Sequence, residues 1–566
     1  MLNQMIKILD KLTPKSYAGI VLVTAAYITL VFNSLFLYKT YVAAVSTGHW
    51  DGLFLLSVPL LLFMLSCIFL TWFSLISFIK PLAILSVLIS AVVFYAVVNY
   101  GVIFDKDMLR NMVETDTGEA FSYLNLSLLL YVVLLGLLPA LILLRTKFTQ
   151  SFGARLKSFL VINLVCITAS AAIMGAFYED YVSIGRNNRQ LTSYITPFAF
   201  YTASYKFVRD KYFLPPLPFQ LLDNAPSLLT PEQGSLTVLI VGETARAKNF
   251  SLGSYTKPTN LYTPELGVKF FSDVSACGTA TAISVPCMFS RLNRQQFKQR
   301  LAQSQENALD IIHRAGVDVL WLDNNSSCKG VCARVENVNI ATSSSQPLCD
   351  GQFCYDEILV QQLVERLAQQ PDQQQTQHEN KQKNKPASNR LIVLHMIGSH
   401  GPTYYRRYPP SQRRFTPDCA RSDIQNCTEA ELANSYDNTI SYTDYILSRV
   451  IKVLQQQTAE NLTLLYVSDH GESLGENGLY LHGFPYSLAP KEQTQVPLIY
   501  WSNQLANQNY NDCVNQQLAK PLSHDNIFDT LLGITHVATK LYQPELDIFT
   551  PCKQLQKVGQ VIAQSN

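Results

Sequence analysis

Four stretches in the second half of the chain end in side chains that could bind a metal or act on phosphate. Each is an apolar run, and the polar residues at its end are Glu243, Asp323, His400 and the pair Asp469–His470. Ligands gather at the carboxyl ends of strands in open α/β sheets. Carboxylates together with an imidazole suit zinc, and manganese is the runner-up. The sequence therefore predicts a metal site built from Glu243, Asp469 and His470.

The segment 277–287, CGTATAISVPC, could supply a nucleophile to that site. A hydroxyl is a poor nucleophile until it is deprotonated, and coordination to a divalent metal can achieve this. Gly278 allows close backbone approach, and a helix that starts in this segment would direct its N-terminal amides at a phosphate. A disulfide between the two flanking cysteines would hold the loop rigid. The chemistry alone leaves three hydroxyls open: Thr279, Thr281 and Ser284.

The elements that must position these residues lie between about residue 231 and residue 566. The runs SLTVLIVGET, VDVLWLDNN, RLIVLHMIGSH and LTLLYVSDH are apolar and rich in branched residues. Such continuous runs are typical of buried, mostly parallel strands with helices between them. We expect an α/β sheet that helices cover on both faces. The polar, Gln-rich stretch near 369–388 is predicted to be a disordered surface insertion.

Five apolar stretches precede this domain, and a bilayer-spanning helix needs about 20 residues. They lie near 17–37, 53–76, 81–102, 124–144 and 157–177. A cleaved signal peptide is disfavoured for the first stretch, because no small-residue cleavage site follows it and four more spans do. Five consecutive stretches of this length also disfavour an ordinary buried helical core. Residues 1–178 are therefore predicted to form a five-helix transmembrane domain.

Basic residues predict the orientation of these spans, because cytoplasmic loops are enriched in Lys and Arg. The amino-terminal segment and the second and fourth connections carry them: Lys7, Lys11, Lys15, Lys80, Arg145, Lys147, Arg155 and Lys157. This pattern places the N-terminus in the cytoplasm. An odd number of spans then puts everything after Tyr178 on the outer side.

Cysteine usage supports the same compartment. Ten of the 12 cysteines lie beyond residue 270, in the couples Cys277/Cys287, Cys328/Cys332, Cys349/Cys354, Cys419/Cys427 and Cys513/Cys552. An even set of near neighbours fits disulfides in an oxidising compartment, with neighbour pairing as the simplest connectivity. The other two, Cys67 and Cys166, fall inside apolar spans as small core residues. A bacterial inner-membrane protein with a periplasmic catalytic domain is the setting we expect.

Two polar segments could meet the membrane surface. In the linker 179–230, Phe198, Tyr201, Tyr205, Val208 and Tyr212 recur at three- and four-residue intervals, with cations between them, which predicts an amphipathic helix in the interface. In the connection after the third span, Asn111, Thr115 and Glu119 recur every four residues. On one helix they would share a face. That face is either a solvated surface or a patch for a lipid headgroup.

The charge pattern excludes one class of partner. The formal net charge is +2, and no long basic run or zinc-finger spacing is present. Nucleic-acid binding is therefore not expected.

Five motifs, together with the five-span anchor, resemble a known family. They are VGETAR, CGTATAISVPCMFS, DNNSSCKGVC, GSHGPTYYRRY and SDHGESLGENGLYLHG. The chain resembles the lipid A phosphoethanolamine transferases, the EptA family that includes the mobile colistin-resistance enzymes. Their catalytic domain belongs to the alkaline-phosphatase superfamily, which has a sulfatase-like α/β fold. The resemblance covers nearly the whole chain except the Gln-rich insertion and the last dozen residues.

The resemblance implies a role for particular residues. Thr281 would be the nucleophile that carries phosphoethanolamine, and the zinc ligands would be Glu243, Thr281, Asp469 and His470. The substrate-binding residues would be Asn111, Thr115, Glu119, Lys329, His400 and His482, and the last two could hold a second zinc. The donor would be phosphatidylethanolamine and the acceptor a lipid A phosphate, so the product would carry less negative charge and confer polymyxin resistance. The enzyme is expected to act as a monomer among membrane lipids.

Several alternatives share part of this pattern. The acceptor could be an inner-core sugar or a periplasmic glucan. A phosphoglycerol transferase similar to lipoteichoic acid synthase would also have five spans and a threonine nucleophile, but the dense cysteines and the loop 277–287 disfavour it. A sulfatase would need a Cys or Ser followed by x-Pro-x-Arg, whereas Cys287 precedes Met-Phe-Ser. A non-enzymatic scaffold would not need the acidic and imidazole set.

Overall fold

The structure of this chain is a computed structural model. It describes residues 14–46, 51–74, 76–115, 117–147, 150–229, 234–340, 347–369 and 389–553. The chain forms two compact units, Met1–Leu109 with Leu124–Phe213 and Arg110–Tyr123 with Leu214–Asn566. The predicted insertion near 369–388 falls, from residue 370 onward, outside the described residues.

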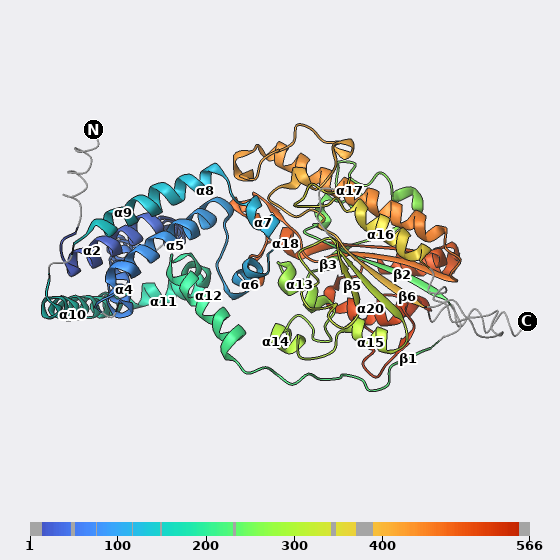
Figure 1. The fold of residues 1–566 in the computed structure, drawn as a ribbon, viewed down its shortest axis with the longest axis horizontal. Helices are drawn as coiled ribbons and strands as arrows, with labels where there is room; N and C mark the ends of the chain where they lie inside the picture. The colour runs from blue at the N-terminus through green and yellow to red at the C-terminus, as the bar shows by residue number, and fades with distance from the viewer. Residues whose placement is uncertain are drawn as a thin grey trace, which may run out of the picture. The chain divides into compact units, whose positions relative to one another are not determined.

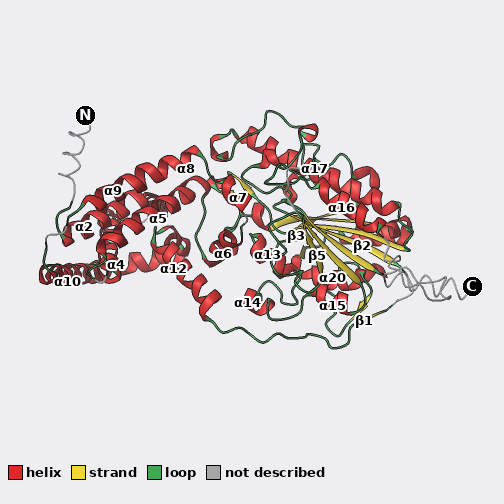
Figure 2. Ribbon diagram, viewed as in Figure 1, coloured by secondary structure: helices red, strands yellow, loops and turns green. Residues whose placement is uncertain are grey.

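The first unit is helical (Figure 2). Four of its helical segments are long and apolar enough to cross a bilayer: α4 (Gly52–Phe73), α5 (Ile79–Tyr100), the run Leu126–Arg145 that contains α8 (Leu126–Tyr131) and α9 (Leu138–Arg145), and α10 (Phe152–Ala176). They match the second to fifth predicted spans to within about five residues at each end.

The first predicted span, near 17–37, falls in a pair of helices that is bent. The chain runs through α2 (Tyr17–Tyr27) and Ile28–Phe32 into α3 (Ser34–Ser46), and the axis bends by 59°. The buried residue Asn33 lies at the bend, where its amide donates to the carbonyls of Ile28 (3.0 Å) and Thr196 (2.7 Å). A buried amide must find partners, and here it finds them in the backbone at the break. The bent pair counts as a fifth span only if both halves are taken together.

The linker after the last span contains α11 (Tyr178–Asn187) and α12 (Phe198–Val208). Phe198 and Tyr201 pack on the ring of Phe69 in α4, with centroid distances of 4.9 and 5.4 Å. Tyr205 and Tyr212 are each 67% exposed. The aromatic repeat is thus divided between packing within the first unit and an exposed surface, and its place at the membrane interface stays a prediction.

The second unit is built on an eight-stranded sheet of order β11-β3-β10-β7-β2-β6-β4-β5 (Figure 1). The strands are β2 (Ser235–Gly242), β3 (Lys269–Ser275), β4 (Asp318–Asp323), β5 (Glu336–Asn339), β6 (Arg390–His395), β7 (Asn461–Ser468), β10 (Gln495–Ser502) and β11 (Leu522–Ser523). The five strands from β7 to β5 are parallel, and β10 is antiparallel to both of its neighbours. The mostly parallel sheet predicted from the apolar runs is confirmed.

Helices cover both faces of this sheet. On one face lie α16 (Glu357–Ala368) and α17 (Glu429–Gln455), and on the other α13 (Thr281–Met288), α15 (Ala308–Arg314) and α20 (Ile527–Ile534), as Figure 1 shows. The central strand β2 is buried along its whole length and β7 at every residue after Asn461, because helices cover them on both sides. Two short ribbons complete the unit, β1 (Ser227–Leu228) with β12 (Val537–Ala538) and β8 (Ser473–Leu474) with β9 (Tyr480–Leu481).

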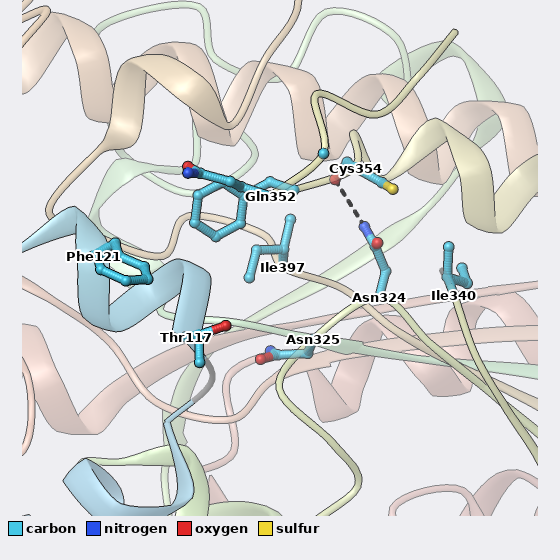
Figure 3. Close-up of a pocket in the computed structure, with 10 residues that line it drawn as sticks. Thr117, Phe121, Asn324, Asn325, Ile340, Gln352, Cys354 and Ile397 are labelled. Atoms are coloured by element: carbon cyan, nitrogen blue, oxygen red, sulfur yellow. Dashed lines mark hydrogen bonds between the residues drawn. The ribbon is translucent and has the colours of Figure 1, made fainter. Parts of the chain in front are cut away.

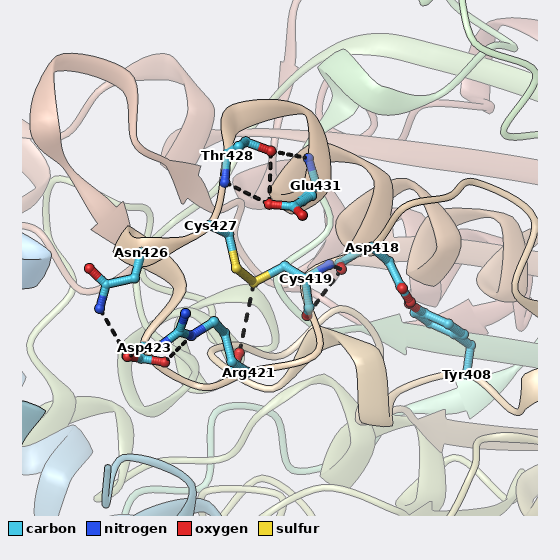
Figure 4. Close-up of a disulfide and its surroundings, with 10 residues drawn as sticks. Tyr408, Asp418, Cys419, Arg421, Asp423, Asn426, Cys427, Thr428 and Glu431 are labelled. Carbon is cyan, nitrogen blue, oxygen red and sulfur yellow. Dashed lines mark hydrogen bonds and ion pairs between the residues drawn. A yellow bond between two sulfur atoms is a disulfide. The ribbon is translucent and has the colours of Figure 1, made fainter. Parts of the chain in front are cut away.

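All five predicted disulfides are present with neighbour pairing. They join Cys277 to Cys287, Cys328 to Cys332, Cys349 to Cys354, Cys419 to Cys427 and Cys513 to Cys552. Figure 4 shows the Cys419–Cys427 bridge. Cys67 and Cys166 are free and buried, as expected for small core residues.

Candidate active site

Two neighbouring strands bring the acidic residues together. β2 and β7 run parallel with Gly242 opposite Ser468, so Glu243 and Asp469 follow at the same edge of the sheet. Ligand atoms of Glu243, Asp469 and His470 all lie within 4.8 Å of one another. All three side chains are buried. Glu243 is distant in sequence from Asp469 and His470, and the fold brings the three residues together as the predicted cluster.

Thr281 completes the cluster. It is the first residue of α13, and its hydroxyl donates to Glu243 Oε2 at 3.0 Å and lies 3.4 Å from His470 Nε2. The hydroxyl of Thr279 instead donates to the Phe484 carbonyl at 2.6 Å, and that of Ser284 donates to the Asp469 carbonyl. Of the three hydroxyls that the sequence left open, Thr281 is the one that faces the acidic cluster.

The cluster carries strongly interacting charges. Burial raises the pKa of Asp469, and the negative charge of Glu243 raises it further. Burial also opposes the charged form of His470, but the charges of Asp469 and Glu243 outweigh it and raise the pKa of this imidazole. Burial alone would raise the pKa of Glu243, yet His470 holds it below its usual value. Such perturbed groups in one buried cluster are typical of functional sites.

The cluster fits a divalent cation. Among the residues that the structure describes, no hydrogen-bond donor is assigned to the buried oxygens Glu243 Oε1 and Asp469 Oδ2, although they lie 3.3 and 3.4 Å from His470 Nε2. Unsatisfied buried carboxylate oxygens are costly unless an ion occupies the space between them. Two carboxylates, one imidazole and the Thr281 hydroxyl form a four-ligand set of oxygen and nitrogen atoms, which suits zinc.

Two further imidazoles border the cluster. The ring of His482 lies 4.5 Å from the ring of His470 and 5.2 Å from that of His400, measured between centroids. His482 Nδ1 lies 3.2 Å from the buried carboxylate of Glu472. Arg407 donates to the His400 carbonyl at 2.8 Å. The structure thus brings His400 and His482 to the site that the sequence proposed for them.

Lys329 lies in a different set of contacts. It is buried, and its ammonium group donates to Ser326 Oγ at 2.8 Å and to the carbonyl of Glu114 at 3.3 Å. Glu114 is the last residue of α6 (Lys106–Glu114). Lys329 is therefore joined to α6 rather than to Thr281 by these bonds.

Asn111, Thr115 and Glu119 do not lie on one continuous helix, because the connection forms two short helices. α6 ends at Glu114, and Glu119 belongs to α7 (Thr117–Ser122). The Thr115 hydroxyl donates back to the Asn111 carbonyl at 2.7 Å. A threonine that bonds its own helix, followed by residues of low helix propensity, ends the helix here. The side chain of Glu119 lies outside what the structure describes.

Asn325 is a site residue that the sequence reasoning missed. Its amide donates to Glu243 Oε2 and to the Met396 carbonyl, each at 2.8 Å. The same carboxylate oxygen accepts from Thr281, so Asn325 helps to orient the acid. Its signal was present in the segment DNNSS, which follows a strand. Asp323, the last residue of β4, is not in the cluster, and its Oδ2 instead lies 3.1 Å from His395 Nδ1.

Glycine is required beneath the cluster at Gly398. Its φ is +50°, and a Cβ there would lie 2.7 Å from the Glu243 carbonyl oxygen. The close approach predicted at Gly278 is also present, because a Cβ there would lie 3.0 Å from the Ser284 nitrogen. Both contacts keep the strand-end loops tightly packed around the site.

Asn325 also lines a pocket of about 350 Å³ (Figure 3). Its lining residues are polar or apolar and none is charged: Thr117, Phe121, Asn324, Asn325, Ile340, Gly351, Gln352, Phe353, Cys354 and Ile397. Asn324 donates to the Cys354 carbonyl at 3.1 Å in this wall. The pocket offers amide, hydroxyl and aromatic groups to an uncharged polar ligand.

A parallel sheet with buried carboxylates, an imidazole and a hydroxyl at its carboxyl edge defines a class of protein. It is a transferase or hydrolase of phosphate or sulfate esters, with side chains that could hold a metal ion. The comparisons agree with this class. A family model described as Sulfatase matches residues 235–537, and one described as Phosphoethanolamine transferase EptA/EptB matches residues 62–212.

Individual relatives cover almost the whole chain. Phosphoethanolamine transferase EptA of Escherichia coli strain K12 is 38% identical over 548 residues, which are 95% of this chain and 97% of that protein. Phosphatidylethanolamine transferase Mcr-1 of Escherichia coli is 33% identical over 91% of this chain and 94% of its own length. The solved structure of the integral membrane protein lipooligosaccharide phosphoethanolamine transferase A (EptA) from Neisseria meningitidis superposes with a TM-score of 0.87 at 35% identity, and the match covers 95% of this chain and 99% of that one.

The chain therefore belongs to the EptA/Mcr family of phosphoethanolamine transferases. It combines a membrane-helix unit with a sulfatase-like α/β domain, as expected from its motifs.

Proposed function

We propose that the enzyme transfers phosphoethanolamine from phosphatidylethanolamine to a phosphate of lipid A through an ester on Thr281. The observation that carries this proposal is the Thr281 hydroxyl, which lies 3.0 Å from Glu243 Oε2 and 3.4 Å from His470 Nε2 inside a buried acidic cluster. The cluster gives this hydroxyl an environment that its neighbours Thr279 and Ser284 do not share.

In the first displacement, the Thr281 oxygen forms a bond to phosphorus and the bond from phosphorus to the diacylglycerol oxygen breaks. The hydroxyl proton leaves along its hydrogen bond to Glu243 and passes to the departing oxygen, so the leaving group is diacylglycerol with a free hydroxyl. The backbone N–H groups of Thr281 and Ala282 belong to the first turn of α13, where a helix leaves its amides free to face a phosphoryl oxygen. His400 and His482 flank the transferred group.

In the second displacement, a phosphate oxygen of lipid A attacks the same phosphorus and the bond to Thr281 breaks. The attacking phosphate hydroxyl gives up its proton and the threonine oxygen takes one up, so the enzyme returns to its starting state. Catalysis of such transfers consists mainly of positioning and of neutralising the phosphoryl oxygens.

The proposed metal is zinc, with Glu243, Thr281, Asp469 and His470 as its ligands and manganese as the alternative. A divalent cation at this position would lower the pKa of the hydroxyl and neutralise negative charge on phosphorus. The two buried carboxylate oxygens without hydrogen bonds support the assignment. His400 and His482 could hold a second zinc during turnover.

The relatives support the donor and the acceptor. Mcr-1 is named a phosphatidylethanolamine transferase, and the Neisseria protein is named for lipooligosaccharide. The uncharged pocket beside Asn325 suits a sugar ring, because amides and aromatic faces recognise neutral hydroxyl-rich ligands. A phosphate on the glucosamine of lipid A combines such a ring with a nucleophilic oxygen. An inner-core sugar or a periplasmic glucan is the alternative acceptor.

We further propose that Asn111, Thr115, Glu119 and Lys329 bind the donor headgroup with the two flanking imidazoles. The bond from Lys329 to the Glu114 carbonyl supports a link between this lysine and α6. The helices span the bacterial inner membrane with a cytoplasmic N-terminus, and the α/β domain works in the periplasm, where its five disulfides are stable.

Mass spectrometry of lipid A from polymyxin-sensitive cells that express the chain tests the proposal. We expect a phosphoethanolamine adduct on lipid A and a raised polymyxin tolerance, because the added amine lowers the net negative charge. Cells that express Thr281→Ala should show neither. An adduct on a core sugar or a glucan, with lipid A unchanged, would overturn the acceptor.

A further inference from the structure

We propose that His524 is a positioning residue that fixes the Thr281 loop against the strand end that carries Asp469 and His470. The inference rests on the proposed role of Thr281 as nucleophile. His524 follows β11 and is 1% exposed, and the reaction described above makes no use of it.

The ring of His524 bonds two segments at once. Its Nδ1 lies 3.1 Å from the backbone nitrogen of Cys277, and its Nε2 lies 3.0 Å from the carbonyl oxygen of Ser468. Cys277 opens the disulfide loop that contains Thr281, and Ser468 immediately precedes Asp469. One imidazole therefore connects the loop 277–287, which contains Thr281, to the end of β7, which precedes Asp469 and His470.

The partners determine which nitrogen carries the proton. A backbone N–H can only donate, so Nδ1 must accept from Cys277, and a carbonyl can only accept, so Nε2 must donate to Ser468. The Ser284 hydroxyl lies 3.3 Å from Nδ1, but it gives its proton to the Asp469 carbonyl. The neutral ring with its proton on Nε2 is the form that satisfies every partner. Burial lowers the pKa of His524 to about 3, which agrees with a neutral ring.

The position matters because Thr281 must lie within hydrogen-bond distance of Glu243. The disulfide closes the loop on itself but does not attach it to β7. His524 attaches the start of the loop to Ser468 at the end of β7, Ser284 attaches α13 to the Asp469 carbonyl, and Thr281 itself lies 3.4 Å from His470 Nε2. Misplacing a reacting atom by about 1 Å can cost about a hundredfold in rate.

Three substitutions separate positioning from packing. Asn carries an amide oxygen where Nδ1 lies and can accept from Cys277, whereas the longer Gln amide reaches toward Ser468 instead. The full-length chain is purified in detergent micelles, and the initial rate of diacylglycerol release from phosphatidylethanolamine is measured. We expect His524→Ala to lower kcat about a hundredfold with KM for the donor within about twofold. His524→Asn should stay within about tenfold of the unsubstituted chain, and His524→Gln should resemble His524→Ala.

A matched control is His313→Asn, since His313 is an exposed histidine on α15. It should leave kcat and the thermal midpoint unchanged. Equal rates for His524→Asn and His524→Gln would overturn the proposal, as would an unchanged kcat in His524→Ala. If His524→Ala does not fold, the comparison of Asn with Gln alone decides, because both fill most of the ring's volume.

Peptide mass mapping of the unsubstituted chain after incubation with donor keeps the two proposals apart. A phosphoethanolamine group on Thr281 with unaffected His524 variants would contradict the positioning role alone. No group on Thr281 would contradict the proposed function, and the positioning role with it.

Discussion

Two short disulfide loops of the α/β unit, 277–287 and 419–427, are closed in the same way but held differently. Their cysteines are 10 and 8 residues apart, and their Cα atoms are separated by 6.0 and 5.9 Å. In the first loop, Cys277 bonds His524, and Thr279 bonds the backbone of Gly483 (2.7 Å) and Phe484 (2.6 Å). Its partners come from segments some 200 residues away.

The second loop is held mostly by itself (Figure 4). Asp423 pairs with Arg421 (2.7 Å) and with Asn426 (2.9 Å), and Thr428 and Glu431 cap the start of α17. Its bonds to the helix are made at Cys419: the nitrogen donates to Ser435 Oγ at 2.6 Å and to the Glu431 carbonyl at 3.2 Å, and the carbonyl lies 3.3 Å from Ser435 Oγ. The comparison teaches that a crosslink of one kind can serve two purposes. One loop presents a hydroxyl to a buried site, and the other stabilises local structure.

The largest difference between the loops should come from the nucleophile itself. Thr281→Ala removes the attacking oxygen, so transfer to lipid A should fall roughly a thousandfold or more. Thr279→Ala loses one hydrogen bond to the backbone, worth about 1 kcal/mol, and should cost at most about tenfold. Transfer assays with purified lipid A check both. If Thr279→Ala lost as much transfer activity as Thr281→Ala, the assignment of Thr281 as the nucleophile would be contradicted.

Metal removal should lower activity through the first loop, because only that loop carries a proposed metal ligand, Thr281. Stringent chelation should lower activity by about a hundredfold or more, because several kcal/mol of charge stabilisation is lost, and zinc should restore it. Inductively coupled plasma spectrometry measures the bound metal. Glu243→Gln keeps the volume but removes one negative charge, so it should bind less zinc. Full activity in a chain shown to contain no metal would contradict the metal site.

Removing each disulfide gives a matched pair of variants. The loops are nearly equal in length, so Cys277→Ala/Cys287→Ala and Cys419→Ala/Cys427→Ala should each cost about 2.5 kcal/mol of chain-entropy stabilisation and lower the thermal midpoint by similar amounts. Activity should differ, because only the first pair frees Thr281 from its position. We expect about ten- to a hundredfold lower kcat for the first pair and less than twofold for the second. Equal activity losses would remove the distinction between the loops.

The smallest effect should come from the ion pair of Arg421 and Asp423 in the second loop, in which the aspartate is largely buried and the arginine is exposed. Burial opposes the charged form of Asp423, but its hydrogen bonds to Arg421 and Asn426 outweigh this and hold the pKa of the carboxyl below its usual value. A lowered pKa in the folded state gives stability above the unfolded pKa, near 4, that is lost as the pH falls through the folded value. Asp423→Asn should therefore cost less than about 1 kcal/mol at pH 7 and nothing at pH 2. Thermal midpoints at the two pH values check this, and an equal loss at both would show that the charge is not responsible.

Much of this architecture was predictable from the sequence because it depends on local patterns. Apolar runs located β2, β4, β6 and β7, and the residues after them located Glu243, Asp469 and His470. Parallel strands end at one edge, so the cluster followed from the pattern. Neighbour pairing of the cysteines was also predictable, because most of the bonded pairs are close in sequence.

The rest depends on contacts between distant segments. The choice of Thr281 over Thr279 and Ser284 needed the positions of Phe484 and the Asp469 carbonyl, which no spacing reveals. The break at Asn33 depends on Thr196, more than 160 residues away. The end of α6 at Glu114 came from a side-chain bond that competes with the helix. No local pattern pointed to His524, because the role proposed for it depends on its bonds to the Cys277 nitrogen and the Ser468 carbonyl, which are distant in sequence.

The most direct test of the account is peptide mass mapping of the full-length chain incubated with phosphatidylethanolamine and no acceptor. The account predicts a phosphoethanolamine group on Thr281 that disappears when lipid A is added. A group on Thr279 or Ser284, or transfer to lipid A with no modified residue at any time, would contradict it.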